Sequence, residues 1–127
     1  HNVTIHSGDI LNHENPLLNQ SNKYDRILID VPCSNTGVFR RRVDAKWRLM
    51  PGFTKDLTRL QFRMVESIIP LLKEGGKMVY STCSIDDEEN GQIVAKIIKK
   101  FPNLKKIDEV LLIPQEDRDG AYASLIG

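Results

Sequence analysis

The stretch that decides the fold runs from Arg26 to Gly37 and reads RILIDVPCSNTG. Its first part, Arg26–Asp30, is a compact apolar run of β-branched character, which is typical of a strand buried on both faces of a sheet. The residues that follow include Pro, Ser, Asn and Gly, all of which favour a turn. The sequence therefore predicts a buried strand that leads directly into a turn carrying Cys33.

A second apolar run, Lys77–Ser81, repeats this arrangement and leads into Thr82-Cys83-Ser84. Between the two predicted strands, apolar residues recur with a helical period after Thr54, which can cap a helix. Pro70 is expected to fray the last turn, and Gly75-Gly76 is expected to end the helix. The helical stripe consists of Leu57, Leu60, Met64, Val65, Ile68 and Leu72.

A second helix is expected to begin near Asp86. Asp86 and Glu89 resemble a capping box, and acidic residues suit the positive end of a helix. Lys99 and Lys100 close this helix, because Pro102 prevents it from continuing. Its apolar stripe consists of Ile93, Val94, Ile97 and Ile98.

Further short strands are expected at Val3–His6, Ile107–Ile113 and Ala121–Ile126, with a loop over Leu11–Lys23. Alternating strands and helices indicate an α/β fold with a mostly parallel sheet. The last two strands are joined only by a turn at Asp117–Gly120, which is too short for a helical crossover. They are therefore predicted to form a terminal antiparallel pair.

The composition excludes several classes of protein. The chain has 127 residues, of which 40% are hydrophobic and 28% charged, so it suits one domain or part of one. Collagen-like and strongly disordered chains are excluded by the frequent apolar runs, and no stretch approaches the roughly 20 apolar residues that span a bilayer. Two cysteines cannot build a disulfide scaffold, so reduced thiols in the cytoplasm are expected. Since the first residue is not Met, the chain is expected to derive from a longer one.

The charge is distributed unevenly along the chain. The formal net charge is +1, but the segment from Phe39 to Arg63 has eight basic residues against Asp44 and Asp56, a net charge of +6 that leaves −5 for the rest. These basic residues are Arg40, Arg41, Arg42, Lys46, Arg48, Lys55, Arg59 and Arg63. A local basic stripe on a nearly neutral protein indicates an anionic partner that contacts one face.

Reactive side chains follow three of the predicted strands. Asp9, Asp30 with Cys33, and Cys83 each come at or just after a carboxyl end. In open α/β sheets, ligands bind outside the carboxyl ends of the strands. The two cysteines in similar positions indicate a paired-thiol site at this edge.

Two motifs resemble those of a known family. Ile29–Ser34 (IDVPCS), followed by Thr36-Gly37, resembles the Asp-Ala-Pro-Cys-Ser motif of the Sun/Fmu family of RNA cytosine-5 methyltransferases. Gly75–Ile85 (GGKMVYSTCSI) resembles the second cysteine motif of that family. The resemblance covers nearly the whole chain and also includes the acidic segment Asp86–Asn90, Arg40–Trp47, the helix that contains Gln61, and Asp119–Tyr122.

The resemblance implies a Rossmann-like methyltransferase that uses S-adenosylmethionine to methylate carbon 5 of a cytosine in ribosomal or transfer RNA, and ribosomal RNA is the expected substrate of the two. It implies that Cys83 is the nucleophile, which adds to carbon 6 of the ring, and that Cys33 assists product release as a general base. Asp30 is expected to contact the cytosine edge and the amino-acid end of the cofactor.

The resemblance also assigns binding residues. Asp9 is expected to bind the adenine amino group of the cofactor, and Pro32 to shape the loop beneath the base. The basic segment is expected to form an RNA-facing arm, in which arginines bind phosphates and an indole stacks on a base. The residues of this basic arm are Arg40, Arg41, Arg42, Lys46 and Trp47.

One part of the family pattern is absent. No glycine-rich cofactor loop followed by an acid that binds ribose is found, since Gly75-Gly76 follows a helix and Gly37 stands alone. Residues 1–127 are therefore predicted to be the C-terminal part of the catalytic domain, without the half that carries this loop. The isolated chain is expected to be inactive, to bind the cofactor weakly, and to self-associate through unpaired strand edges.

Simpler interpretations stay open for each candidate residue. Cys33 and Cys83 can be small buried apolar residues. Asp30 can be a strand-end carboxylate that caps nearby backbone amides, Asp9 can belong to an ordinary Gly-Asp turn, and Pro32 can be an ordinary turn proline. The basic arm can be a solvated loop with Trp47 in the core. No histidine has metal-ligand spacing, so no metal site is expected. For the whole chain, the alternatives are a non-catalytic α/β RNA-binding fragment and a thiol redox protein, which requires the two cysteines to lie within disulfide range.

Overall fold

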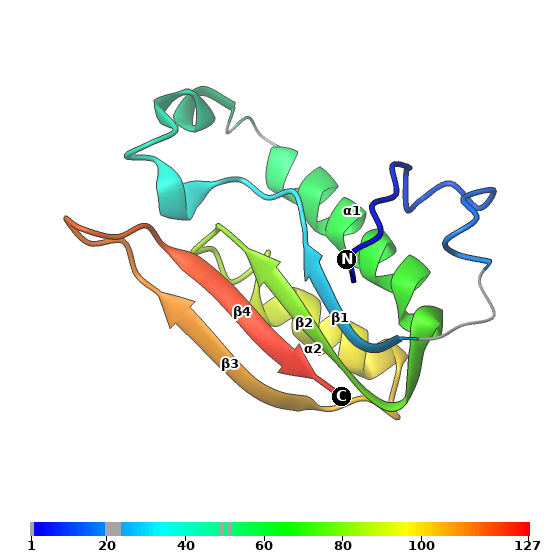
Figure 1. Cartoon of the computed structure of the whole chain (residues 1–127). Coiled ribbons are helices and arrows are strands. Elements are labelled where there is room, and N and C mark those ends of the chain that lie inside the picture. Colours follow the sequence, from blue (N-terminus) through cyan, green and yellow to red (C-terminus); the bar gives the residue numbers. More distant parts are fainter. Residues whose placement is uncertain (1, 20–23, 49, 51) are drawn as a thin grey trace.

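In the computed structural model, which describes residues 2–19, 24–48, 50 and 52–127, four strands form one sheet in the order β1-β2-β4-β3 (Figure 1). The strands are β1 (Tyr24–Asp30), β2 (Leu72–Thr82), β3 (Lys106–Leu112) and β4 (Ala121–Ile126). β1 and β2 are parallel, whereas β4 runs antiparallel to both β2 and β3. The α/β fold class and the terminal antiparallel pair are thereby confirmed, and the described sheet is mixed, since β1 and β2 form its one parallel pair.

Two helices cover one face of the sheet. α1 (Phe53–Ile68) and α2 (Gly91–Lys100) both lie behind the sheet in Figure 1. Their apolar stripes pack on alternate strand residues, so the core lies in a single layer between helices and sheet. The fully buried apolar side chains of this layer are Val65, Ile93, Ile97, Met78, Tyr80 and Ile126.

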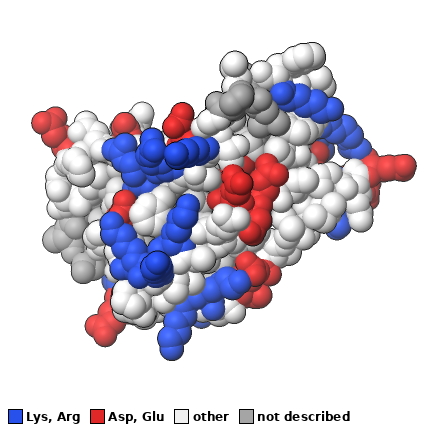
Figure 2. All heavy atoms as spheres, turned by 180° about the vertical axis from the view of Figure 1, so that it is seen from behind, with Lys and Arg blue, Asp and Glu red and all other residues white. Residues whose placement is uncertain are grey.

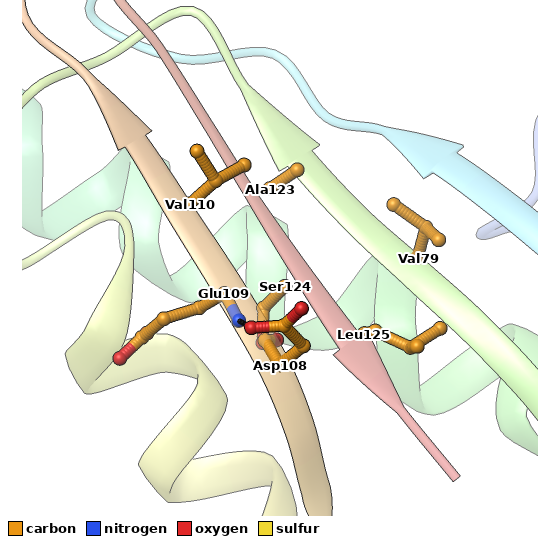
Figure 3. Close-up of a pocket in the computed structure, with 7 residues that line it drawn as sticks. All are labelled: Val79, Asp108, Glu109, Val110, Ala123, Ser124 and Leu125. Atoms are coloured by element: carbon orange, nitrogen blue, oxygen red, sulfur yellow. Dashed lines mark hydrogen bonds between the residues drawn. The ribbon is translucent and has the colours of Figure 1, made fainter.

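The opposite face of the sheet is open in the described part of the chain. Leu28 of β1 is 73% exposed, and every residue of β3 is exposed. Figure 3 shows side chains from three neighbouring strands around a shallow hollow of about 200 Å³ on this face. The apolar ones are Val79, Val110, Ala123 and Leu125. The predicted strand Arg26–Asp30 is thus buried on one face only.

The prediction of a strand at Val3–His6 is wrong, because these residues are exposed and have no regular structure. β1 is an edge strand of the described sheet, and Val3–His6 does not pair with it. The loop expected over Leu11–Lys23 is present as turns up to Asn19, and its last four residues lie outside the described part.

The first predicted helix is too long at its end and starts without its predicted cap. α1 begins after Gly52, which has a φ of 86°, and no side chain caps it. It ends at Ile68, because the ring of Pro70 forces a short 3-10 helix, η3 (Ile69–Leu71). β2 then starts at Leu72 and is longer than the predicted Lys77–Ser81, since its first residues pair with the start of β1.

The second helix starts later than predicted, at Gly91 instead of near Asp86. The predicted capping box is wrong, because the carboxylate of Glu89 is fully buried and binds Ser34 on a distant loop. The residues before α2 form turns, in which the amide of Glu89 donates to the carbonyl of Asp86. A long-range contact therefore replaces a local one.

Two more 3-10 helices lie in the loop between β1 and α1. η1 (Thr36–Val38) continues the first cysteine motif, and η2 (Val43–Arg48) carries the end of the basic arm. Ala45 is 3% exposed and anchors η2 to the body of the protein. Among the described residues, no helix is long and apolar enough to cross a membrane.

Candidate active site

The two cysteines meet at the carboxyl end of the parallel strand pair. Asp30 of β1 pairs with Ser81 of β2, and the amide of Val31 extends this ladder by donating to the carbonyl of Ser81. Cys83 directly follows β2, and the turn after β1 returns Cys33 toward it. The two Sγ atoms lie 2.9 Å apart, and both residues are free thiols. The predicted paired-thiol site is present, and the distance required by the redox alternative is also met.

The contact makes the two thiols unequal in acidity. A hydrogen bond from Cys33 lowers the pKa of Cys83 to about 7, against opposing effects of burial and of the charges on Asp30 and Glu89. The same contact, together with burial, raises the pKa of Cys33 far above that of an ordinary thiol. Near neutral pH, Cys83 is therefore the thiol that ionises more readily, and Cys33 keeps its proton.

Gly37 locks the two cysteine segments together through backbone contacts. Its amide donates to the carbonyl of Cys83 at 3.0 Å, and its carbonyl accepts from the amide of Gly120 at 2.7 Å. A Cβ at this position would lie 2.5 Å from the Gly120 oxygen and 2.6 Å from the Cys83 oxygen. The loop therefore requires a residue without a side chain for reasons of space.

The buried carboxylate of Glu89 fixes the first cysteine motif by hydrogen bonds. Glu89 accepts hydrogen bonds from the amide of Ser34 at 2.9 Å, from the Ser34 hydroxyl, and from Nε2 of Gln61 at 2.9 Å. The same Nε2 donates to the carbonyl of Pro32 at 2.9 Å, so α1 and the turn before α2 both fix the backbone around Cys33. No feature of the sequence indicates this role of Glu89, because the acidic run Asp86–Glu89 has the composition of an ordinary helix start.

The second cysteine motif is held by a set of side-chain hydroxyls and amides. Thr36 Oγ1 lies 3.0 Å from Ser84 Oγ and accepts from the amide of Ile85 at 3.0 Å. Asn90 joins the turn before α2 to the end of β2, since it accepts from Thr82 Oγ1 at 2.6 Å and donates to the carbonyl of Ser84 at 2.9 Å. Both cysteines thus lie on a loop pair that has little freedom to move.

Asp30 lies beside Cys83 on the open face of the sheet. Its carboxylate is exposed and accepts from Ser81 Oγ at 3.0 Å. Asp30 and Cys83 line one hollow of about 400 Å³, together with apolar side chains of three strands that include Leu28, Val110 and Leu112. The site therefore combines a thiol, a carboxylate and an apolar surface.

The comparisons with known proteins identify the family of this chain. The family profile described as 16S rRNA methyltransferase RsmB/F matches residues 1–123. The chain belongs to the RsmB/F family. This confirms the Sun/Fmu resemblance, which rests on the two cysteine motifs.

Named relatives are similar over part of their length. The ribosomal RNA small subunit methyltransferase B of Yersinia enterocolitica is 49% identical over 108 residues, which are 79% of this chain and 25% of that protein. The protein of the same name from Yersinia pseudotuberculosis is 48% identical over 80 residues, 63% of this chain and 19% of that protein. The chain thus spans about a quarter or less of these relatives.

Solved structures show the same fold. NSun6 from Pyrococcus horikoshii, solved with SFG, superimposes with a TM-score of 0.82 at 25% identity, over 98% of this chain and 34% of that one. A methyltransferase homolog protein from Pyrococcus horikoshii gives a TM-score of 0.61 at 24% identity, over 98% of this chain and 44% of that one. The Rossmann-like methyltransferase fold of this RsmB/F chain is therefore confirmed.

In the part of the chain that the structure describes, no side-chain hydrogen bond or ion pair joins Asp9 or Pro32 to the cysteines. Asp9 is exposed, and its carboxylate accepts from the amide of Leu11 at 2.8 Å within its own turn. No hydrogen bond among the described residues links Asp9 to Asp30, Cys33 or Cys83. Pro32 is exposed, and its carbonyl is held by Gln61. The cofactor-binding roles of both residues stay predictions.

The basic arm of this RsmB/F chain lies on the surface, with all five predicted residues exposed. Trp47 is 85% exposed, so the alternative that places it in the core is wrong. Arg41 Nε lies 3.0 Å from a carboxylate oxygen of Asp119, and Lys46 Nζ lies 5.8 Å from the ring centre of Phe39. The first contact joins the arm to the loop before β4, and the second joins it to Phe39, which directly precedes the arm in the chain.

Basic residues are not confined to the arm. Figure 2 shows Lys and Arg in separate groups on the helical side, with Asp and Glu between them. α2 and the residues that follow it contain five lysines, of which Lys100 pairs with Glu66 of α1 and Lys106 pairs with Glu109 of β3. These are Lys96, Lys99, Lys100, Lys105 and Lys106. Among the described residues, no group of three His, Cys, Asp or Glu side chains is arranged to hold a metal ion.

Proposed function

We propose that this chain carries the catalytic cysteines of a methyltransferase that transfers a methyl group from S-adenosylmethionine to carbon 5 of a cytosine in RNA, and that this RNA is ribosomal. The supporting observation is the unequal thiol pair, with 2.9 Å between the sulfurs. Adding to a pyrimidine ring requires a thiolate, and the later loss of a ring proton requires a second group close by. Cys83 and Cys33 supply these two groups.

In the proposed reaction, the Cys83 thiolate uses an electron pair to form a bond to carbon 6 of the cytosine. The π pair between carbons 5 and 6 is displaced toward carbon 4 and nitrogen 3, which gives an enamine whose carbon 5 is nucleophilic. S-adenosylmethionine, when bound, would supply the methyl group to that carbon and be left as the neutral thioether, with the pair of the broken carbon–sulfur bond on its sulfur. The proton on carbon 5 is then removed, its bonding pair restores the double bond, and the sulfur–carbon bond breaks with its pair returning to Cys83.

Cys33 is suited to remove that proton at the right stage. Its pKa is raised mainly by its hydrogen bond to Cys83. Once the Cys83 sulfur is bonded to carbon 6, it is a neutral thioether, so this cause no longer acts. Cys33 then loses its own proton to solvent more readily and can accept the one from carbon 5.

The residues around Asp30 fit the cofactor. Its exposed carboxylate offers an acceptor for the ammonium group of the amino-acid end, beside a hollow of about 400 Å³ that also contains Cys83. The negative charge of Asp30 acts on Cys83, so Asp30 lies close to the sulfur that would bond to the cytosine. We therefore also assign to Asp30 a contact with the cytosine edge. We assign Asp9 to the adenine amino group and Pro32 to the loop beneath the base. A relative of similar fold was solved with SFG, an analogue of S-adenosylmethionine.

We assign RNA binding to the surface that carries the basic arm. Exposed guanidinium groups suit phosphate contacts, and an 85% exposed indole suits stacking on an unpaired base. Relatives named as ribosomal RNA small subunit methyltransferase B favour ribosomal over transfer RNA. Unoxidised thiols fit a reaction in the cytoplasm.

The test uses the complete gene product with S-adenosylmethionine and a 16S ribosomal RNA fragment that contains 5-fluorocytosine. Because fluorine at carbon 5 cannot leave as a proton, the covalent intermediate persists and adds the mass of the RNA to the protein. The proposal predicts that the adduct disappears in Cys83→Ala and survives in Cys33→Ala. An adduct in Cys83→Ala would overturn the assignment of the nucleophile.

The sulfur distance also supports a second candidate, a dithiol redox protein. A complete gene product that binds cofactor and RNA without forming an adduct would overturn the proposal in favour of a non-catalytic RNA-binding protein. A product that binds neither and cycles between dithiol and disulfide would overturn it in favour of the redox candidate.

A further inference from the structure

Asn35 contacts both cysteine motifs at once. Its side-chain Nδ2 donates to the carbonyl of Cys33 at 3.0 Å, and its Oδ1 lies 2.9 Å from Cys83 Sγ, positioned to accept the thiol proton. Its φ of 63° places it in the left-handed region, and no other described residue except glycine has a positive φ. Asn tolerates this conformation better than most residues.

The orientation of the amide follows from its partners. A carbonyl oxygen can only accept, so the contact with the Cys33 carbonyl requires Nδ2 on that side. Oδ1 is then directed at the Cys83 sulfur. This sulfur accepts from the Cys33 thiol and donates to Asn35, so the two neighbours act on it in opposite ways.

We propose that Asn35 is a positioning residue that holds the Cys83 thiol in its protonated form and fixes the direction of its S–H bond. When Cys83 loses its proton, the hydrogen bond to Oδ1 is lost and the anion faces the negative end of an amide dipole. Asn35 therefore opposes the ionisation that Cys33 promotes. The inference rests on the proposed function only in taking Cys83 as the nucleophile.

Two charged groups also act on the Cys83 sulfur. Asp30 from β1 and Glu89 from the turn before α2 both disfavour the thiolate, and Cys33 is the neighbour that favours it. Asn35 differs from these acids because its effect depends on one directional hydrogen bond. Removing its side chain should therefore lower the Cys83 pKa, whereas adding a charge at the same place should raise it.

The experiment measures the rate at which iodoacetamide alkylates Cys83, from pH 5 to pH 10, with Cys33 followed separately by peptide mass. Asn35→Gly keeps the left-handed backbone available and is expected to shift the midpoint down by about half a pH unit, a roughly threefold faster reaction at pH 6. Asn35→Asp, of the same shape, is expected to shift it up by about one unit or more, with a roughly tenfold slower reaction at pH 6.

Asn12→Gly makes the same substitution at an exposed turn residue and should leave the midpoint unchanged. The inference is overturned if Asn35→Gly raises the midpoint, because the amide nitrogen would then face the sulfur. It is also overturned if both variants titrate like the parent protein. If Asn35→Gly does not fold by circular dichroism, Asn35→Asp decides alone. Since the titration needs neither RNA nor methyl transfer, its outcome is independent of the adduct experiment.

Discussion

Replacing Gly37 by Ala should damage the thiol site more than it damages the fold. The added Cβ would lie 2.5 Å from the oxygen of Gly120 and 2.6 Å from that of Cys83, whereas ordinary contacts begin at 3.4 Å. Both neighbours are backbone atoms, so they cannot rotate away as a side chain would. The Cys33 loop must therefore move by close to 1 Å relative to both segments.

A movement of this size breaks two hydrogen bonds. The bond from the Gly37 amide to Cys83 is 3.0 Å long and that from the Gly120 amide to Gly37 is 2.7 Å, so both would pass beyond the usual limit of about 3.2 Å. Each is worth about 1 kcal/mol net, and Ala recovers less than about 1 kcal/mol by restricting the unfolded chain. With about 1 kcal/mol for the steric strain, the expected loss in unfolding free energy is about 2 kcal/mol.

The chemical effect follows from the sulfur contact. When Cys83 moves away from the Cys33 thiol, the main cause of its lowered pKa is lost. A return of the pKa from about 7 toward the ordinary value of about 8.5 reduces the thiolate fraction at pH 7 roughly tenfold. The rate of Cys83 alkylation at pH 7 should fall by this factor.

The assay combines urea unfolding with alkylation rates, and Gly75→Ala is the matched control. Gly75 lies near the other end of β2 with open space around it and a φ of 72°, so Ala costs about 1–2 kcal/mol there through backbone strain alone. The control should lose stability and keep its Cys83 rate. If Gly37→Ala keeps both its stability and its alkylation rate, the reasoning from close packing is refuted.

Three further predictions concern the thiols and the basic arm. Cys33→Ala should move the midpoint of Cys83 alkylation upward from about 7, because the donor that stabilises the thiolate is gone; an unchanged midpoint would exclude that cause. Diamide should join Cys33 and Cys83, lowering the intact mass by about 2 Da reversibly with dithiothreitol, and Cys33→Ser should block this. Trp47→Ala should change the unfolding free energy by less than about 0.5 kcal/mol, because Trp47 is 85% exposed. The same substitution should weaken the binding of single-stranded ribosomal RNA roughly 5- to 100-fold, because a stacking surface is lost. Equal affinity of the variant and the parent protein would show that Trp47 does not contact the RNA.

The strands were predictable because their signals are local. β4 has the predicted bounds Ala121–Ile126, and β1 and β3 differ from the predicted strands by one or two residues at an end. The meeting of Cys33 and Cys83 was also predictable in outline, since parallel strands bring their carboxyl ends to one edge. Both inferences use only apolar periodicity and the positions of turns.

The supports of the site were not predictable in the same way. Glu89 was assigned to a capping box on the basis of its three-residue spacing from Asp86, but its carboxylate binds Ser34, which is 55 residues away in sequence. Sequence spacing cannot distinguish a carboxylate that caps its own helix from one buried under another loop. Val3–His6 fails for a related reason, because alternation of apolar and polar residues predicts the two faces of a strand but not whether it pairs with a neighbour, and this segment does not pair with β1, an edge strand of the described sheet.

The groups that act on the Cys83 sulfur are largely separate from those that the proposed function assigns to substrate binding, and Asp30 belongs to both sets. The contacts that set the acidity of Cys83, from Cys33, Asn35, Gly37 and Glu89, all lie within the described residues and fix the two loops on both sides. Asp30 and the open sheet face instead present an exposed carboxylate and exposed apolar side chains. We therefore expect Cys83 to show its lowered pKa in this chain alone, whether or not the chain binds the cofactor or self-associates through the open sheet. A normal thiol pKa for Cys83 in the isolated chain would mean that groups outside these residues set its reactivity.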